Sequence, residues 1–192
     1  MIKQTLDFLV ENLNEYILGK TGLSTRVKQG RLVSAAGSEV VGDGFIWCQL
    51  VNLDEERIGK AQLPIAPPTG SNFPYRNPEI KLNLCLLFST NPKDGSSEYA
   101  NSMSLLAYVI QYFQGKHHFT TENSPGLDPE IGTLIVELYP MSMENQNYLW
   151  GSLGAKYRPS VVYKVRLITV LDDALIGSAG APTGIDLQGG FN

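Results

Sequence analysis

The chain has 192 residues, of which 43% are hydrophobic and 18% are charged, and its formal net charge is −4. This length and hydrophobic content are typical of one globular domain, whereas the low charged fraction favours surfaces that neighbouring proteins cover. An acidic chain without a basic stripe argues against a nucleic-acid partner, and no apolar run approaches the roughly 20 residues needed for membrane insertion.

Cysteine usage and the N-terminal segment favour a protein that assembles in the cytoplasm. Cys48 and Cys85 both lie within apolar runs, where a free thiol behaves as a small hydrophobic side chain. The first residues carry acids and amides instead of the apolar core and cleavage site of a signal peptide. We therefore expect free thiols and no signal peptide.

Two helices are predicted in the first 115 residues. The first ends near Gly19 and Gly22, and its apolar residues share one face: Ile2, Leu6, Leu9, Leu13 and Ile17. The second covers residues 97–114, before Gly115. Its buried face is expected to comprise Tyr99, Met103, Leu106, Ile110 and Phe113, widened by Leu105, Val109 and Tyr112. Such a broad apolar circumference predicts a helix that is covered on more than one side.

Four apolar or alternating stretches predict strands, at residues 45–53, 79–88, 133–139 and 160–171. A short helix is predicted to begin at the Ser142 cap and to carry Trp150. The proline-rich residues 54–78 predict a long loop, either functional or a linker. Together these elements predict one α+β domain over residues 1–172, with a mixed or mainly antiparallel sheet packed by two or three helices. Residues 173–192 are expected to form a flexible C-terminal tail.

Motifs for catalysis or metal binding are not found in the sequence. His117 and His118 are adjacent in a predicted loop with Glu122 nearby, but adjacent loop side chains rarely converge on one metal. The sequence contains no GxSxG elbow, no phosphate-binding glycine loop with its lysine, and no HExxH motif. We therefore expect no catalytic residue, no metal, no cofactor and no enzymatic activity.

Several long motifs carry a resemblance to a known family. The run NQNYLWGSLGAKYRPSVVYKVRLITV (145–170) strongly resembles the signature of the tail-terminator, or cap, family of phage-tail-like contractile injection systems of the antifeeding-prophage and virulence-cassette type. Further motifs agree in order and spacing: LNLCLLFSTNP (82–92), VIQYFQGKHHF (109–119), the NSP turn (123–125) and IVELYPMSMENQNYLW (135–150). The resemblance extends from the N-terminal helix to about Asp172.

The resemblance implies a structural subunit that closes the distal end of the inner tube and contractile sheath of a bacterial particle. It implies a homo-hexameric ring whose partners are the tube and sheath proteins, in a particle that is either released or retained. Several family members carry a further C-terminal region, whereas this chain ends about twenty residues after the conserved part.

Interface residues are expected in and after the aromatic run from Tyr148 to Tyr157, where large rings lie beside small residues. The expected residues are Trp150, Tyr157, Arg158, Tyr163 and Arg166. For each of them, core packing or a solvated strand face is the competing interpretation, and Tyr163 is expected to point inward.

Two alternatives stay open from the sequence. One is a neck or baseplate-completion subunit of the same machine, which differs from a cap only in its position on the particle. The other is a peptide- or carbohydrate-binding module, for which aromatic residues on a sheet would form the binding face.

Overall fold

The structure is a computed structural model that describes residues 1–34, 36–39, 44–56, 72–76, 80–92, 95–170 and 175–180. The helices are α1 (Ile2–Thr21), α2 (Ser96–Gly115), the short 3-10 helix η1 (Pro129–Ile131) and α3 (Met143–Leu153). The strands are β1 (Val27–Gln29), β2 (Ile46–Glu55), β3 (Asn72–Arg76), β4 (Ile80–Thr90), β5 (His118–Thr120), β6 (Thr133–Leu138), β7 (Ser160–Val170) and β8 (Leu175–Gly180).

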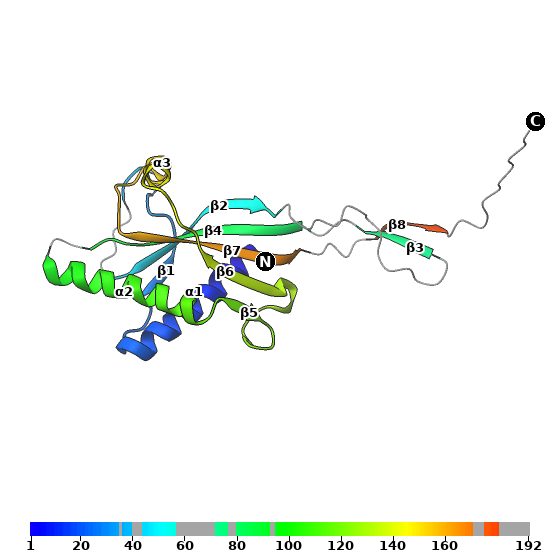
Figure 1. Ribbon diagram of the computed structural model, residues 1–192, viewed down its shortest axis with the longest axis horizontal. Helices are drawn as coiled ribbons and strands as arrows, with labels where there is room; N and C mark the ends of the chain where they lie inside the picture. Colours follow the sequence, from blue (N-terminus) through cyan, green and yellow to red (C-terminus); the bar gives the residue numbers. More distant parts are fainter. Residues whose placement is uncertain are drawn as a thin grey trace, which may run out of the picture.

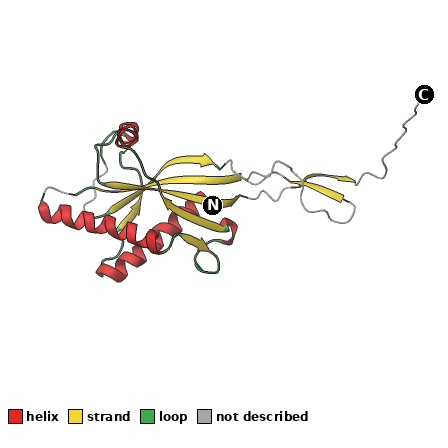
Figure 2. Cartoon of the chain, in the orientation of Figure 1, coloured by secondary structure: helices red, strands yellow, loops and turns green. Residues whose placement is uncertain are grey.

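A six-stranded mixed sheet with the order β1-β2-β4-β7-β6-β5 forms the body of the molecule. β1 runs parallel to β2, and every other neighbouring pair in this sheet is antiparallel. Helices α1 and α2 cover one face of the sheet, and α3 lies on the opposite face (Figure 1, Figure 2). This arrangement confirms the predicted α+β domain with a mainly antiparallel sheet packed by helices.

The larger hydrophobic core lies between the sheet and the pair α1 and α2. Alternate residues of β4 face it, because successive side chains of a strand point to opposite faces; Leu84, Leu86 and Phe88 are fully buried there. From α1, Leu13 and Ile17 meet them with no exposed surface. The predicted stripe of the first helix is therefore confirmed at the positions that pack most deeply.

A second, smaller core lies on the α3 face. Leu87 of β4 and Val162 of β7 point to this side, where they are buried with Leu32 and Trp150. Strands β4 and β7 are thus covered on both faces near α3, which explains why their sequences read as almost continuous apolar runs.

The predicted burial of the second helix needs correction. Tyr99 and Ile110, which were expected inside, are exposed, whereas Leu105 and Val109 are buried. The buried face of α2 is rotated about the helix axis towards Leu105 and Val109, which belong to the larger core between the helix pair and the sheet. Tyr112 of α2 also meets Tyr16 of α1, with the ring centroids 5.3 Å apart, so α2 is covered by both the sheet and α1, as predicted.

Four short strands lie outside the four stretches predicted as strands, because each is held by pairing with another segment of the chain. β1 and β5 lie at the two edges of the sheet and have three residues each. β3 lies in the predicted loop 54–78 and pairs with β8, which lies in the predicted tail. A strand that contains Pro74 is compatible with this small two-stranded sheet, since proline is tolerated at sheet edges. Residues 57–71 and 77–78 of the predicted loop, and residues 173–174 and 181–192 of the predicted tail, lie outside the described residues.

Glycines in and after α3 allow a paired test of its C-terminal end. Ser142 caps the start of α3, and its Oγ accepts a hydrogen bond from the N–H of Asn145; Gly154, which has a φ of 65°, caps the end of the helix. Gly154→Ala is expected to lower the free energy of unfolding by about 1 kcal/mol, because a side chain is strained at this φ. Gly151→Ala, inside the helix, is expected to raise it by about 0.5–1 kcal/mol.

Neither added Cβ would meet another atom within 4 Å, so conformational preference alone sets both effects. Urea denaturation of the two variants measures them. Two changes of the same sign would contradict the left-handed end of α3.

Candidate protein–protein interface

Helix α3 is fixed to the sheet through Trp150. This side chain is only 4% exposed and packs in the smaller core, where it meets the ring of Tyr157 edge-on at a centroid distance of 5.9 Å. Tyr157, in contrast, is 63% exposed. Two residues that the sequence placed at an interface are therefore in contact, with Trp150 packed against the sheet and Tyr157 presented to solvent.

Arg158 is buried beside these rings and forms an ion pair with Glu39. Its Nη2 lies 2.8 Å from Oε2 of Glu39, and the side chains of Arg158 and Glu39 are 3% and 31% exposed. The backbone N–H of Lys156 donates to the same carboxylate at 3.1 Å. The hydrogen bond from Arg158 and that from Lys156 hold the pKa of Glu39 below its ordinary value. The pair therefore connects the segment after β1 to the segment between α3 and β7.

Tyr163 and Arg166 lie apart from this group. Tyr163 points to the larger core, where its ring lies 4.7 Å from that of Phe113 and 5.9 Å from that of Phe88, so it points inward as expected. Arg166 lies on the α3 face in a cluster of charges, with Nη2 3.4 Å from Oε2 of Glu56 and Nε 3.9 Å from Oε2 of Glu137. Such partly exposed pairs contribute little to stability, and their charges face the surface.

Among the described residues, five of the ten exposed large apolar side chains lie on α3, just after it or at the end of β6. Those near α3 are Met143, Tyr148 and Tyr157, and those at the end of β6 are Leu138 and Tyr139. The sequence indicated Tyr148 and Tyr157 through the aromatic run. It missed Leu138, Tyr139 and Met143, which resemble ordinary strand and helix residues. One sequence signal points to this region: Pro140 has no N–H to donate to a neighbouring strand, so it marks the end of strand pairing after β6.

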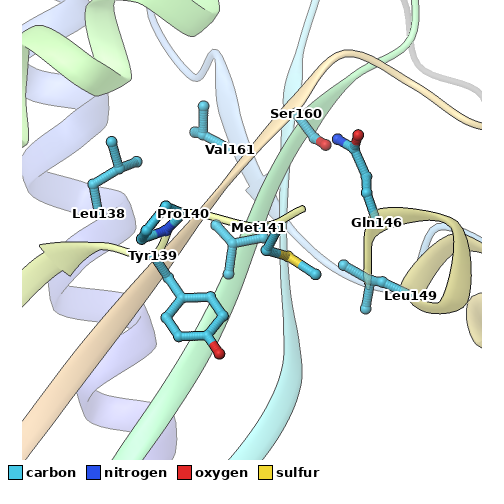
Figure 3. A pocket seen from close by; sticks show the side chains of 9 residues that line it. Leu138, Tyr139, Pro140, Met141, Gln146, Leu149, Ser160 and Val161 are labelled. Atoms are coloured by element: carbon cyan, nitrogen blue, oxygen red, sulfur yellow. The ribbon is translucent and has the colours of Figure 1, made fainter. Parts of the chain in front are cut away.

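Two adjoining pockets lie between α3 and the sheet. The first has a volume of about 170 Å³, and Figure 3 shows its wall running from Leu138 to Met141 on one side, with Gln146 and Leu149 from α3 on the other. The second has a volume of about 240 Å³ and reaches Cys85 and Lys164. The pockets share four lining residues: Tyr139, Met141, Leu149 and Val162. This continuous hollow, the α3 groove, was not predicted from the sequence.

Both cysteines are free, as expected, and differ in access. Cys48 is buried in the larger core, and burial raises its pKa to about 12. Cys85 lines the α3 groove and is partly exposed; burial, with the nearby charge of Asp54, raises its pKa as well. A raised pKa is the opposite of the lowered pKa that activates a nucleophilic cysteine.

Ligating side chains do not gather in the described part of the chain. His117 and His118 are both exposed, and within the described ranges no three His, Cys, Asp or Glu side chains are placed to hold a metal ion. None of the described helices combines the length and apolar content that crossing a membrane requires.

Fold and surface together define an α+β domain in which exposed apolar side chains adjoin a groove between α3 and the sheet, a feature typical of surfaces that contact other proteins. The chain belongs to the family of the Pvc16 N-terminal domain, whose sequence model matches residues 5–180. No curated protein matches the chain.

Two solved structures share the fold over most of the chain. One is the sheath/tube terminator of the extracellular contractile injection system PVC in its extended state, with a TM-score of 0.55 and 13% identity over 92% of this chain and 61% of that chain. The other is the tube-terminating cap of the anti-feeding prophage, AFP, with a TM-score of 0.53 and 11% identity over 91% of this chain and 58% of that chain. At these identities the likeness shows a shared fold, and the chain spans about three fifths of the length of both proteins.

Proposed function

We propose that this protein is a structural, non-catalytic subunit that closes the distal end of the inner tube and contractile sheath of a contractile injection system, as a ring of six copies. The observation that carries the proposal is the family match over residues 5–180, joined to a fold shared with two tube-terminating proteins. The motif-bearing run 145–170 forms α3 and β7, which border the exposed apolar surface.

Physical features of the domain support a role at the end of a stacked-ring assembly. The last ring of a tube leaves surfaces and strand edges without partners, and a cap has to cover them. β1 pairs only with Ile46–Cys48 of β2, and no described strand pairs with residues 50–54 on that side. Such an edge can accept a strand from a neighbouring protein by β-augmentation.

Among the residues expected at an interface, we propose that Tyr157 makes direct contact with a partner, together with Met143 and Tyr148 of α3. Their side chains are exposed and apolar or aromatic, which is the chemistry enriched at the centres of protein interfaces. Trp150 and Arg158 would act indirectly, by holding this surface in place, and Arg166 would contribute a charge beside it.

The proposal is tested by the length distribution of particles from a producer strain that lacks this gene, imaged by electron microscopy. We expect sheathed tubes of uncontrolled length or unstable empty tubes, with normal lengths restored by the gene supplied in trans. Averaged images of the distal end should show added density with six-fold symmetry when the protein is present.

Other outcomes would separate the alternatives. Particles of normal length with an unchanged distal end would contradict a cap. A defect confined to the neck or the baseplate would move the protein to that position. Unaffected particles together with ligand binding by a monomer would indicate a peptide- or carbohydrate-binding module.

A further inference from the structure

The α3 groove has the shape to hold two neighbouring side chains of an extended segment. Its two pockets share four lining residues, so they lie next to each other. A cavity of about 150 Å³ can hold a benzene molecule, so pockets of about 170 and 240 Å³ can each hold an aliphatic side chain. In an extended chain, alternate side chains lie on the same side at a spacing of about 7 Å. Two adjoining pockets of this size are compatible with apolar residues at positions i and i+2.

The C-terminal residues 181–192 contain this pattern once. Ile185 and Leu187 are apolar, and Asp186 and Gln188 alternate with them. Alternation of apolar and polar residues is typical of an extended segment with one buried side. Bound in the groove, the segment would direct Ile185 and Leu187 to the two pockets and its polar side chains to solvent.

The segment cannot reach the groove of its own chain. Leu187 is seven residues after Gly180, so it lies at most about 25 Å from the end of β8. The groove reaches Lys164, near the middle of β7, and from there to the end of β7 is about 20 Å. β8 adds about 20 Å in the same direction, since both strands point away from α3 (Figure 1).

We propose that Ile185 and Leu187 of one copy bind in the α3 groove of a neighbouring copy and so connect adjacent subunits of the ring. The inference rests on the proposed function, because it requires several copies side by side. Each copy donates one segment and offers one groove, so the contact is head-to-tail and a closed ring satisfies every groove. The surface around Tyr139 and Leu149 is then an interface between copies.

Cys85 provides a direct test, because it lines the groove and is the more accessible of the two cysteines. The full-length variant Leu187→Cys keeps a small apolar side chain at the position proposed to enter the groove. Under mild oxidation it is expected to form disulfide-linked dimers and a ladder of higher species on non-reducing gels. Two matched controls are expected to stay mainly monomeric: Gln188→Cys, whose thiol would point away from the groove, and Leu187→Cys combined with Cys85→Ser.

Light scattering of the unmodified protein separates failure of this contact from failure of the proposed ring. An oligomer in which Leu187→Cys and Gln188→Cys cross-link at equal rates would overturn the groove contact and leave the ring intact. A disulfide within one monomer would show that the segment folds back on its own chain, against the proposal. A monomer without cross-links would overturn the tail exchange in solution, while the proposed function would still be decided by the particle images.

Discussion

Trp150→Ala is expected to lower the free energy of unfolding of the isolated protein by about 3–5 kcal/mol, the range measured for removal of a large buried aromatic side chain. Trp150 is 4% exposed and belongs to the smaller core with Leu32, Leu87 and Val162. It is the only buried residue of α3. Its loss therefore removes the main contact between α3 and the sheet. Urea denaturation measures the effect, with unfolding monitored by far-ultraviolet circular dichroism, a signal that does not depend on the removed tryptophan.

Tyr157→Ala is the matched control for this prediction, because the two rings touch but differ in exposure. Tyr157 is 63% exposed, so its removal is expected to change stability by less than about 1 kcal/mol. In particles, however, it is expected to weaken incorporation at the tube end. The opposite pattern, a stable Trp150→Ala protein that fails to join tails, would show that Trp150 itself makes the contact with a partner.

The difference between Trp150 and Tyr157 illustrates what the sequence could establish. Both lie in the same aromatic run, and both were expected at an interface with core packing as the alternative. The Ser142 cap predicted the start of helix α3 correctly. Which ring points to the sheet depends on how α3 docks on β4 and β7, which is a long-range property and cannot be derived from local spacing.

The strands also differ in whether local sequence or long-range pairing determines them. Residues 79–88 and 160–171 were predicted because each carries a long apolar or alternating run, and these runs form β4 and β7 at the centre of the sheet. β1 and β5 have three residues each and are stabilised by pairing with β2 and β6. The α3 groove is harder still to predict, because Met141, Leu149 and Cys85 come from three distant segments that meet only in the folded chain.

Glu39→Ala is expected to lower the free energy of unfolding by about 2–3 kcal/mol, because it leaves the charge of Arg158 buried without its partner. The estimate lies at the low end for buried pairs, since Glu39 is 31% exposed and water reaches part of the pair. Nε and Nη1 of Arg158 already have no hydrogen-bond partner among the described residues. The double variant Glu39→Ala with Arg158→Met removes the buried charge and is expected to recover most of the loss.

The pH dependence of stability provides an independent check on this pair. The pKa of Glu39 is lowered in the folded protein by its hydrogen bonds from Arg158 and Lys156, so the unfolded chain takes up a proton at higher pH than the folded one. The stabilisation is complete above the ordinary glutamate pKa of about 4.3 and is lost as the pH falls through the lower folded value. Urea denaturation at a series of pH values should therefore show that, below about pH 4.3, the free energy of unfolding falls more steeply for the unmodified protein than for Glu39→Ala. If the free energy of unfolding of both proteins falls in parallel with pH, the carboxylate of Glu39 is not held by Arg158. In the separate test with the double variant, a stability as low as that of Glu39→Ala would mean that the loss comes from packing instead of the buried charge.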